Sequence, residues 1–167
     1  IPIVLPPLVV GLSLLILFQF VPDSLRAFRE AIVYQVPAVI IAQFMVACAF
    51  AVRTMQATFH LIDPRREQVA LTLGCSRFQA FSRVVLPEAW RGMITAGTLA
   101  WARALGEFGA TLMLAGNIPG KTSTMPLAIY AAVAGGEWER AHAMVLLFTG
   151  ISVAALTAAN HLARSAP

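Results

Sequence analysis

The feature that most constrains this chain is a set of four apolar stretches, each close to the length that crosses a lipid bilayer. A bilayer core is about 30 Å thick, so a spanning helix needs roughly 20 predominantly apolar residues. Backbone groups in lipid must be hydrogen-bonded within the protein, which favours helices over open strands. The sequence therefore predicts an all-α fold, a polytopic membrane helix bundle that forms a single transmembrane domain over residues 1–167, with spans at about 3–20, 36–52, 92–115 and 143–162.

The composition supports this class, because 59% of the residues are hydrophobic and only 12% are charged. A soluble domain is roughly 45–50% apolar and about 25% charged. So few charges exclude a typical cytosolic enzyme, and the high hydrophobicity excludes a disordered chain. The net charge of +4 comes without a basic cluster interleaved with aromatic residues, so no nucleic-acid partner is expected. Cys48 and Cys75 stand in different surroundings, and no disulfide framework is expected.

A fifth apolar stretch, Met125–Ala134, is only ten residues long and is too short to cross a bilayer. Pro119-Gly120 precedes it and Gly135-Gly136 follows it, and such pairs mark turns. We expect an interfacial or re-entrant helix here.

The positions of the charged residues predict the orientation of the spans, because cytoplasmic loops carry an excess of Lys and Arg. The segment between the second and third spans, together with the tail after the fourth, carries seven such residues against four in the loops on the opposite side. We therefore expect the segment of about residues 53–91 and the C-terminus to face the cytoplasm. The seven residues are Arg53, Arg65, Arg66, Arg77, Arg83, Arg91 and Arg164.

The segment of residues 53–91 carries signals for two short helices separated by a glycine. Pro64 suits the first turn of a helix, and Gly74 stands where a left-handed C-cap is needed. A second helix is expected to start near Ser76 and to end at Pro87. Its apolar side chains recur with the spacing of one helix face, namely Phe78, Phe81, Val84 and Val85. The periodicity alone also fits a basic helix pair that lies on anionic lipid.

This segment resembles the EAA loop of the permease subunits of bacterial ABC importers. The resemblance lies in Glu67-Gln68-Val69-Ala70, Gly74 and the ending Val84-Val85-Leu86-Pro87. Val69 stands where the family usually has Ala, and Leu71 where Arg is common. The family implies that the helix pair docks into a cleft of a cytoplasmic ATP-binding subunit, with the two phenylalanines as buried anchors. The residues expected to form this coupling loop are Glu67, Gln68, Ala70, Gly74, Phe78, Phe81, Leu86 and Pro87.

The third span contains the string Leu105-Gly106-Glu107-Phe108-Gly109-Ala110-Thr111. An acid near the bilayer centre costs several kcal/mol, and Arg103 lies four residues earlier on the same helix face, where it can pair with Glu107. Two interpretations stay open. The pair is a structural link between helices, or it lines a translocation path. Gly106, Gly109 and Gly116 permit close helix approach or a break in the helix.

This string and the turn after it resemble the oxyanion branch of the same permeases, in which molybdate/tungstate and sulfate importers share Gly-Glu-Phe-Gly-Ala. The turn 117–120, the segment 126–130 and the N-terminal segment 5–11 resemble the molybdate type. The resemblance spans nearly the whole chain but leaves out one or two N-terminal helices that family members normally have, so we expect an N-terminally truncated permease fold. It implies a translocation path that includes Arg103, Gly106, Glu107, Phe108, Gly109 and Thr111.

The turn after the third span is expected to face the exterior. Its Asn, Lys and Thr residues offer hydrogen-bond donors to a tetrahedral oxyanion or to a receptor surface. The alternative is an ordinary Pro-Gly turn that reverses the chain. Tyr130 is similarly ambiguous, since aromatic residues also form interfacial belts. The turn residues concerned are Asn117, Pro119, Gly120, Thr122 and Thr124.

Several function classes lack their motifs in this sequence. There is no Walker string, so the energy for transport must come from a partner. The histidines lack metal-ligand spacing, and no metal or cofactor is expected. Ser152 and His161 share the fourth span but are separated by about 13–14 Å along a helix, too far to bond each other. An intramembrane hydrolase and a passive channel therefore remain the weaker alternatives.

The function that we predict is that of a membrane-spanning subunit of an ABC importer, which is not itself an enzyme. Molybdate is the expected substrate, with sulfate, thiosulfate or tungstate as the alternative. The resemblance implies a homodimer in the lipid bilayer of the cell (inner or plasma) membrane. The other partners that it implies are two cytoplasmic ATP-binding subunits and an extracytoplasmic oxyanion-binding protein.

Overall fold

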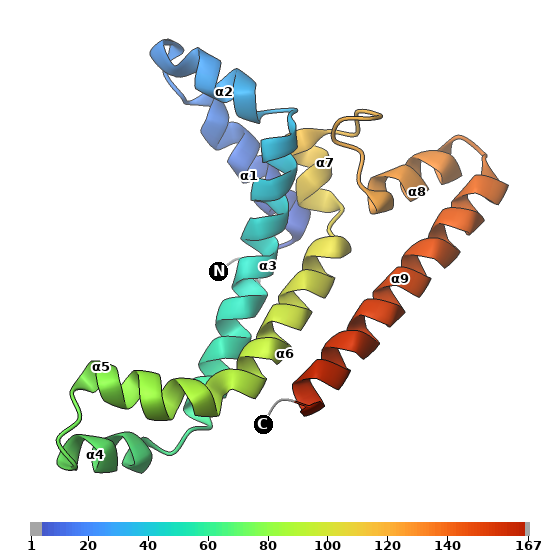
Figure 1. Cartoon of the computed structure of the whole chain (residues 1–167). Coiled ribbons are helices and arrows are strands. Elements are labelled where there is room, and N and C mark those ends of the chain that lie inside the picture. Colours follow the sequence, from blue (N-terminus) through green and yellow to red (C-terminus); the bar gives the residue numbers. More distant parts are fainter. Residues whose placement is uncertain (1–4, 166–167) are drawn as a thin grey trace.

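A computed structural model describes residues 5–165, apart from the side chains of Asn160 and of residues 162–165. The regular elements of this part of the chain are all helical, which confirms the predicted all-α class (Figure 1). Ile3 and Val4 of the first predicted span, and the Arg164 side chain, lie outside the described residues. The elements are α1 (Pro7–Gln19), the 3-10 turn η1 (Asp23–Leu25), α2 (Arg26–Ile32), α3 (Val36–His60), α4 (Pro64–Thr72), α5 (Arg77–Ala80), the π-helical segment η2 (Phe81–Val85), α6 (Leu86–Leu105), α7 (Gly109–Ala115), α8 (Met125–Ala134) and α9 (Trp138–Ser165).

Two of the four predicted spans coincide with helices that are long and apolar enough to cross a membrane. These are α3 and the part of α9 over Trp138–Ala159. Helix α1 and the segment Asp23–Ile32 meet the same criterion together, but they are bent by 106° and count as a third span only if the bent pair crosses as one unit. Helix α8 has the bounds of the short apolar helix predicted from the sequence.

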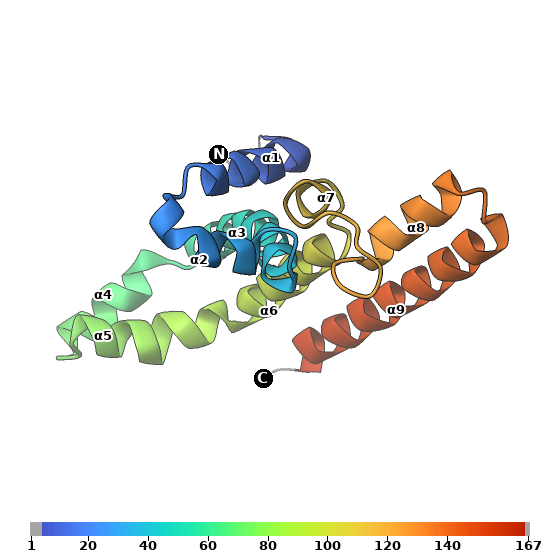
Figure 2. The same cartoon turned by 90° about the horizontal axis from the view of Figure 1, so that it is seen from above.

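The structure differs from the prediction of one continuous segment over residues 92–115. Helix α6 ends at Leu105 and α7 begins at Gly109, so Gly106–Phe108 separates two helices. Because the chain breaks here, α7 leaves the end of α6 and packs against both α1 and α3 (Figures 1 and 2). The predicted third span is therefore an assembly of one long and one short helix.

The long helices α3 and α6 lie side by side in the middle of the molecule (Figures 1 and 2). Helices α8 and α9 form an antiparallel hairpin to one side, where α9 also packs against α6. Helices α4 and α5 project from the lower ends of α3 and α6 as a second hairpin (Figure 1). We call this hairpin, residues 64–85, the foot.

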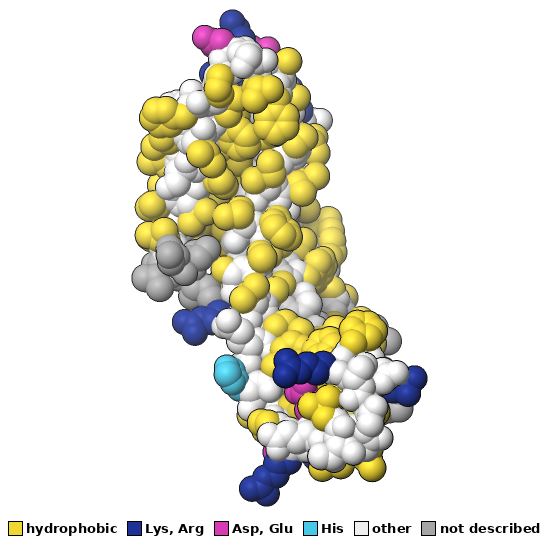
Figure 3. Space-filling model, turned by 90° about the vertical axis from the view of Figure 1, so that its left-hand side faces the viewer, with side chains coloured by type: hydrophobic (Ala, Val, Ile, Leu, Met, Phe, Trp, Pro, Cys, Tyr) yellow, Lys and Arg dark blue, Asp and Glu magenta, His cyan; other side chains and the backbone are white. Residues whose placement is uncertain are grey.

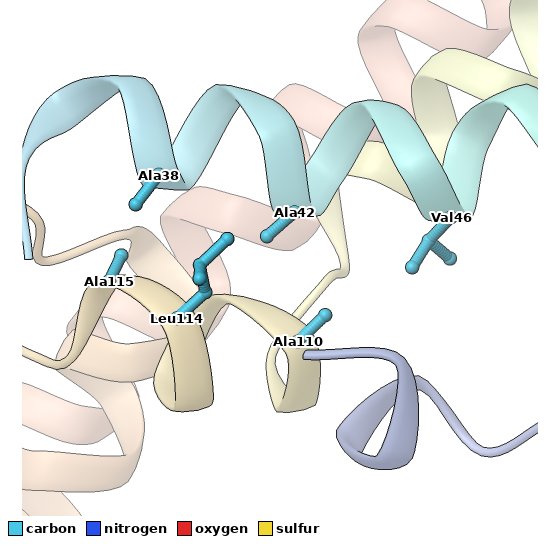
Figure 4. Packing of buried hydrophobic residues seen from close by; sticks show 6 residues of the cluster. All are labelled: Ala38, Ala42, Val46, Ala110, Leu114 and Ala115. Atoms are coloured by element: carbon cyan, nitrogen blue, oxygen red, sulfur yellow. The ribbon is translucent and has the colours of Figure 1, made fainter. Parts of the chain in front are cut away.

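The core between α3 and α7 is built from small and medium-sized apolar side chains. Small side chains let helix backbones approach closely, and this packing drives much of the helix association within membranes. The same close approach occurs between α7 and α1, since a Cβ added at Gly11 would lie 2.6 Å from the Cα of Ala110. The residues that face one another between α3 and α7 are Ala38, Ala42 and Val46 on one side and Ala110, Leu114 and Ala115 on the other (Figure 4).

The face of the molecule shown in Figure 3 has an apolar middle and charged ends. Hydrophobic side chains cover the upper part of this face, and the Lys, Arg, Asp and Glu side chains gather at the top and over the foot (Figure 3). On helix α3, for example, the side chains of Ile40 and Phe44 are each 62% exposed. An apolar band between two polar ends is the distribution expected of a surface that meets lipid.

We expect Gly11→Ala to destabilise the subunit by about 1–3 kcal/mol, the usual cost of overpacking. The added methyl group meets the backbone of Ala110, with the carbonyl oxygen at 2.7 Å, and backbone cannot rotate away. The measurement is the apparent melting temperature of the purified full-length subunit in detergent. Gly150→Ala is the matched control, because no atom lies within 4 Å of its added Cβ. Equal melting temperatures for the two variants would contradict the close contact of α1 and α7.

Candidate functional site

The foot is a helix–Gly–helix hairpin, and its first helix, α4, is capped at both ends. The Asp63 side chain accepts a hydrogen bond of 2.9 Å from the backbone N–H of Arg65 at the start of α4. At the other end Gly74 has a φ of +89°, and the N–H of Cys75 donates to the carbonyl of Ala70 at 3.1 Å. These contacts form a Schellman cap, the left-handed ending that the sequence predicts at Gly74.

The second helix of the foot begins as the sequence predicts but does not end at Pro87. Ser76 and Gln79 form a capping box ahead of α5. From there α5, η2 and α6 run on as one continuous helical stretch (Figure 1). The N–H of Leu86 donates to the carbonyl of Phe81, five residues back, which is the widened π-type turn. This widened turn directly precedes Pro87, which has no N–H to continue the ladder, so the helix continues where the sequence predicts an end.

The two predicted aromatic anchors have different surroundings. Phe78 is 78% exposed on the foot, whereas Phe81 packs against Phe59 at the end of α3, with ring centroids 6.2 Å apart. Val69 on α4 and Leu73 at its C-cap are also exposed, at 57% and 79%. The foot therefore presents an apolar surface from α4 and α5, while Phe81 belongs to its attachment to α3. Of the other predicted coupling residues, Ala70 is buried, Glu67 and Leu86 are half-buried, and Gln68, Gly74 and Pro87 are exposed.

The break between α6 and α7 is organised around the buried carboxylate of Glu107, which is 1% exposed. Its Oε1 accepts a hydrogen bond of 2.9 Å from the N–H of Ala110 in the first turn of α7. Its Oε2 lies 2.7 Å from Nη1 of Arg103 in the last turn of α6. Arg103 is partly exposed, at 26% of its side chain, and its guanidinium carbon lies 5.6 Å from the centroid of the Phe50 ring on α3. One carboxylate thus joins α6 to α7.

The remaining residues of the predicted translocation path lie around this carboxylate. A Cβ at Gly109 would lie 3.0 Å from the backbone nitrogen of Leu8, so Gly109 permits close packing of α7 on α1. Phe108 makes an edge-to-face contact with Tyr130 of α8, with ring centroids 5.2 Å apart. Thr111 is fully buried, and Gly106 is the C-cap of α6. These residues lie at the end of α6, in the break and in the first turn of α7, and Arg103 is the member of the charged pair that reaches an exposed surface.

The predicted outer turn is held together by some of the residues that were expected to donate to a ligand. Thr122 is 2% exposed, and its hydroxyl accepts from the N–H of Ile118 at 3.1 Å. The Asn117 side-chain amide donates to the carbonyl of Leu127 at 3.3 Å. Pro119 and Gly120 are exposed at the tip, and Thr124 is half-buried. The turn is therefore an ordered structure with Thr122 as its internal support.

One contact that the sequence analysis missed places the turn against the start of α3. Tyr34 has a φ of +57°, and its N–H donates to the carbonyl of Leu114 at the end of α7 at 3.3 Å. A Cβ at Gly116 would lie 3.3 Å from the Tyr34 ring. Nothing in the local sequence signals a left-handed tyrosine, since such a conformation is rare for a bulky residue.

The Ser152–His161 pair considered from the sequence lies on α9. The Ser152 hydroxyl donates to the carbonyl of Phe148 within its own helix at 2.8 Å. A serine bonded in this way to the preceding turn is typical of helix interiors.

Comparison with known proteins agrees with the sequence-based family resemblance. The family model of the binding-protein-dependent transport system inner membrane component matches residues 1–166. The chain is 39% identical over 155 residues to a putative molybdenum transport system permease protein of Bacillus subtilis, covering 90% of this chain and 68% of the relative. It is 34% identical over 169 residues to the molybdenum transport system permease protein of Escherichia coli, covering 98% and 73%.

A sulfate transport system permease protein of Escherichia coli is also 34% identical, over 164 residues, covering 96% of this chain and 59% of the relative. The chain therefore spans about three fifths to three quarters of the length of these relatives. The resemblance to ABC-importer permeases is confirmed. The prediction that the chain is a transport subunit and not itself an enzyme is also confirmed. The chain belongs to the family of binding-protein-dependent transport system inner membrane components.

Proposed function

We propose that this chain is the membrane-spanning subunit of an ABC importer that carries an oxyanion into the cell, driven by ATP hydrolysis in partner subunits. The observation that carries the proposal is the foot, a capped helix–Gly–helix hairpin that projects from the ends of α3 and α6 and exposes apolar side chains (Figure 1). A channel or an intramembrane hydrolase has no need of such a surface. An importer needs it to receive the movement of an ATP-binding subunit.

The proposed assembly is a homodimer with two cytoplasmic ATP-binding subunits and an extracytoplasmic oxyanion-binding protein. In this arrangement the foot and the C-terminus face the cytoplasm, and the turn of residues 116–124 faces the exterior. Closure of the ATP-binding subunits shifts the population between inward-open and outward-open states, because ATP binds one of these states more tightly. The foot connects directly to α3 and α6, so these helices move first.

Molybdate is the proposed substrate, with sulfate, thiosulfate or tungstate as the alternative. Named relatives of both the molybdenum and the sulfate class have similar identity to this chain. We place Arg103 on the translocation path, because its guanidinium is the part of the buried pair that reaches an exposed surface. A guanidinium donates paired hydrogen bonds to tetrahedral oxyanions.

Uptake of radiolabelled molybdate, tungstate and sulfate tests the proposal directly. The full-length gene is expressed with its partner subunits in a strain that lacks its own uptake systems. We expect ATP-dependent uptake of molybdate that unlabelled tungstate competes with and sulfate does not. Uptake of sulfate in preference to molybdate would reassign the substrate, and uptake of none of the three would overturn the oxyanion assignment.

Gly74→Val tests the docking role of the foot. We expect the subunit to reach the membrane but to lose most of the ATP-binding subunits on co-purification. A left-handed conformation costs a residue with a Cβ about 1–2 kcal/mol, and no neighbouring atom lies within 4 Å of the new Cβ, so the effect is confined to the backbone of the turn. Gly74→Asn is the control, because Asn adopts this conformation more readily. Undiminished co-purification of the valine variant would count against docking through the foot.

The two interpretations of the Arg103–Glu107 pair are separated by a double variant. Glu107→Ala removes the buried carboxylate and leaves the partly exposed guanidinium of Arg103 and the N–H of Ala110 without their acceptor, so we expect a loss of about 1–3 kcal/mol of stability. Replacing both residues by Met removes the two charges together. We expect the amount of folded subunit in the membrane to return close to that of the wild type. We expect the double variant to transport at least about tenfold less oxyanion, a loss of ~1.4 kcal/mol. Wild-type transport by the folded double variant would show that the pair is only structural.

A further inference from the structure

The junction between the foot and α6 is a point where a continuous helix is open to bending. The five residues of η2 form a π-helical turn, a rare geometry that is frequently found at functional sites. Pro87 follows two positions after η2 and interrupts the hydrogen-bond ladder, and kinks in helices are found at such positions. We call this junction, residues 81–87, the elbow.

The inner side of the elbow is not filled by packing. Beside the contact of Phe81 with Phe59 lies a hollow of about 270 Å³, lined by residues of the elbow, the end of α3 and the start of α4. Phe59, Phe81 and Val85 form its apolar wall, and Asp63 and Glu67 line the side next to α4. The foot thus has room to change its angle relative to α6, unless a contact on another side prevents it.

Such a contact is the ion pair between Arg66 and Glu88. Arg66 lies on α4, before the elbow, and Glu88 lies in the first turn of α6, beyond it. Nη1 of Arg66 is 2.5 Å from Oε1 of Glu88, across 22 residues of sequence. The pairs Arg26–Glu30, Arg103–Glu107 and Glu137–Arg140 join residues that are only three or four apart. The Arg66–Glu88 pair, in contrast, connects two separate elements across the elbow.

We propose that the Arg66–Glu88 ion pair is a brace that holds the elbow at a fixed angle, so that a displacement of α4 by an ATP-binding subunit is passed to α6. Arg66 and Glu88 are then positioning residues for coupled transport, and this proposal rests on the function proposed above. The side chains are 61% and 28% exposed. An exposed pair contributes little to overall stability, so its loss leaves the subunit folded and releases the elbow.

A double-mutant cycle in the complete transporter tests the brace. The variants are Arg66→Glu, Glu88→Arg and the charge-swapped double variant, each reconstituted in liposomes with the ATP-binding subunits and the binding protein. The quantity measured is the number of ATP molecules hydrolysed per oxyanion transported. We expect each single variant to raise this ratio about threefold to fivefold, which corresponds to ~0.6–1 kcal/mol of lost coupling. The double variant is expected to return to within about twofold of the wild type.

The pair Arg26–Glu30 on α2 provides a matched control, since it has the same chemistry but lies within one helix. Arg26→Glu and Glu30→Arg are expected to leave the ratio unchanged. An unchanged ratio in both brace variants, or a charge-swapped variant no better than the single ones, would overturn the proposal.

A second measurement reports on the elbow without relying on transport. Spin labels at Arg77→Cys in α5 and Thr95→Cys in α6, with Cys48 and Cys75 replaced by Ser, give the distribution of distances across the elbow in the full-length subunit. We expect each single brace variant to broaden this distribution and the charge-swapped variant to narrow it again. Failure of all uptake together with a broadened distribution would remove the proposed function but keep the brace. Unbroadened distributions in a functional importer would remove the brace alone.

Discussion

The packing of this chain depends on the carboxylate of Glu107. A helix that begins inside a protein leaves backbone N–H groups without partners, and Glu107 accepts one of them from Ala110 while its other oxygen pairs with Arg103 of the preceding helix. One side chain thus contacts both sides of the break. Because α6 stops here, α7 is free to place its small residues against α3 and its first turn against α1. A continuous helix would carry these residues straight on along the axis of α6 instead.

The sequence predicted the parts of the structure that depend on local signals. The lengths of the apolar stretches indicated α3 and α9, and the combination of Pro64 and Gly74 indicated the first helix of the foot and its left-handed cap. The break at Gly106–Phe108 was not predicted, because its cause lies elsewhere in the chain. Close packing of α7 on α1 requires Gly11 and Gly109 to meet partners about a hundred residues apart in sequence.

The foot shows the same division between local and distant causes. Helical spacing placed Phe78 and Phe81 on one face of their own helix, but it could not show that Phe81 packs against the end of α3 and is 42% exposed, while Phe78 is 78% exposed. The local rule for proline predicted an end at Pro87, whereas a π-type turn lets the helix continue into α6. The pairing of Arg66 with Glu88 could not be predicted from the sequence either, because it depends on the angle at which the foot folds back.

Helix α6 is preceded by the π-type turn of η2 and followed by the break at Gly106–Phe108, and an Arg–Glu pair bridges each of these two points. Glu88 and Arg103 are separated by about 22 Å along this helix, so a rigid α6 connects the elbow to the break. The two pairs differ in burial: the side chains are 61% and 28% exposed at the elbow but 26% and 1% at the break. When an exposed ion pair opens, water solvates both charges. When a buried ion pair opens, an uncompensated charge stays inside the protein. The pair at the elbow therefore contributes less to folding than the pair at the break does.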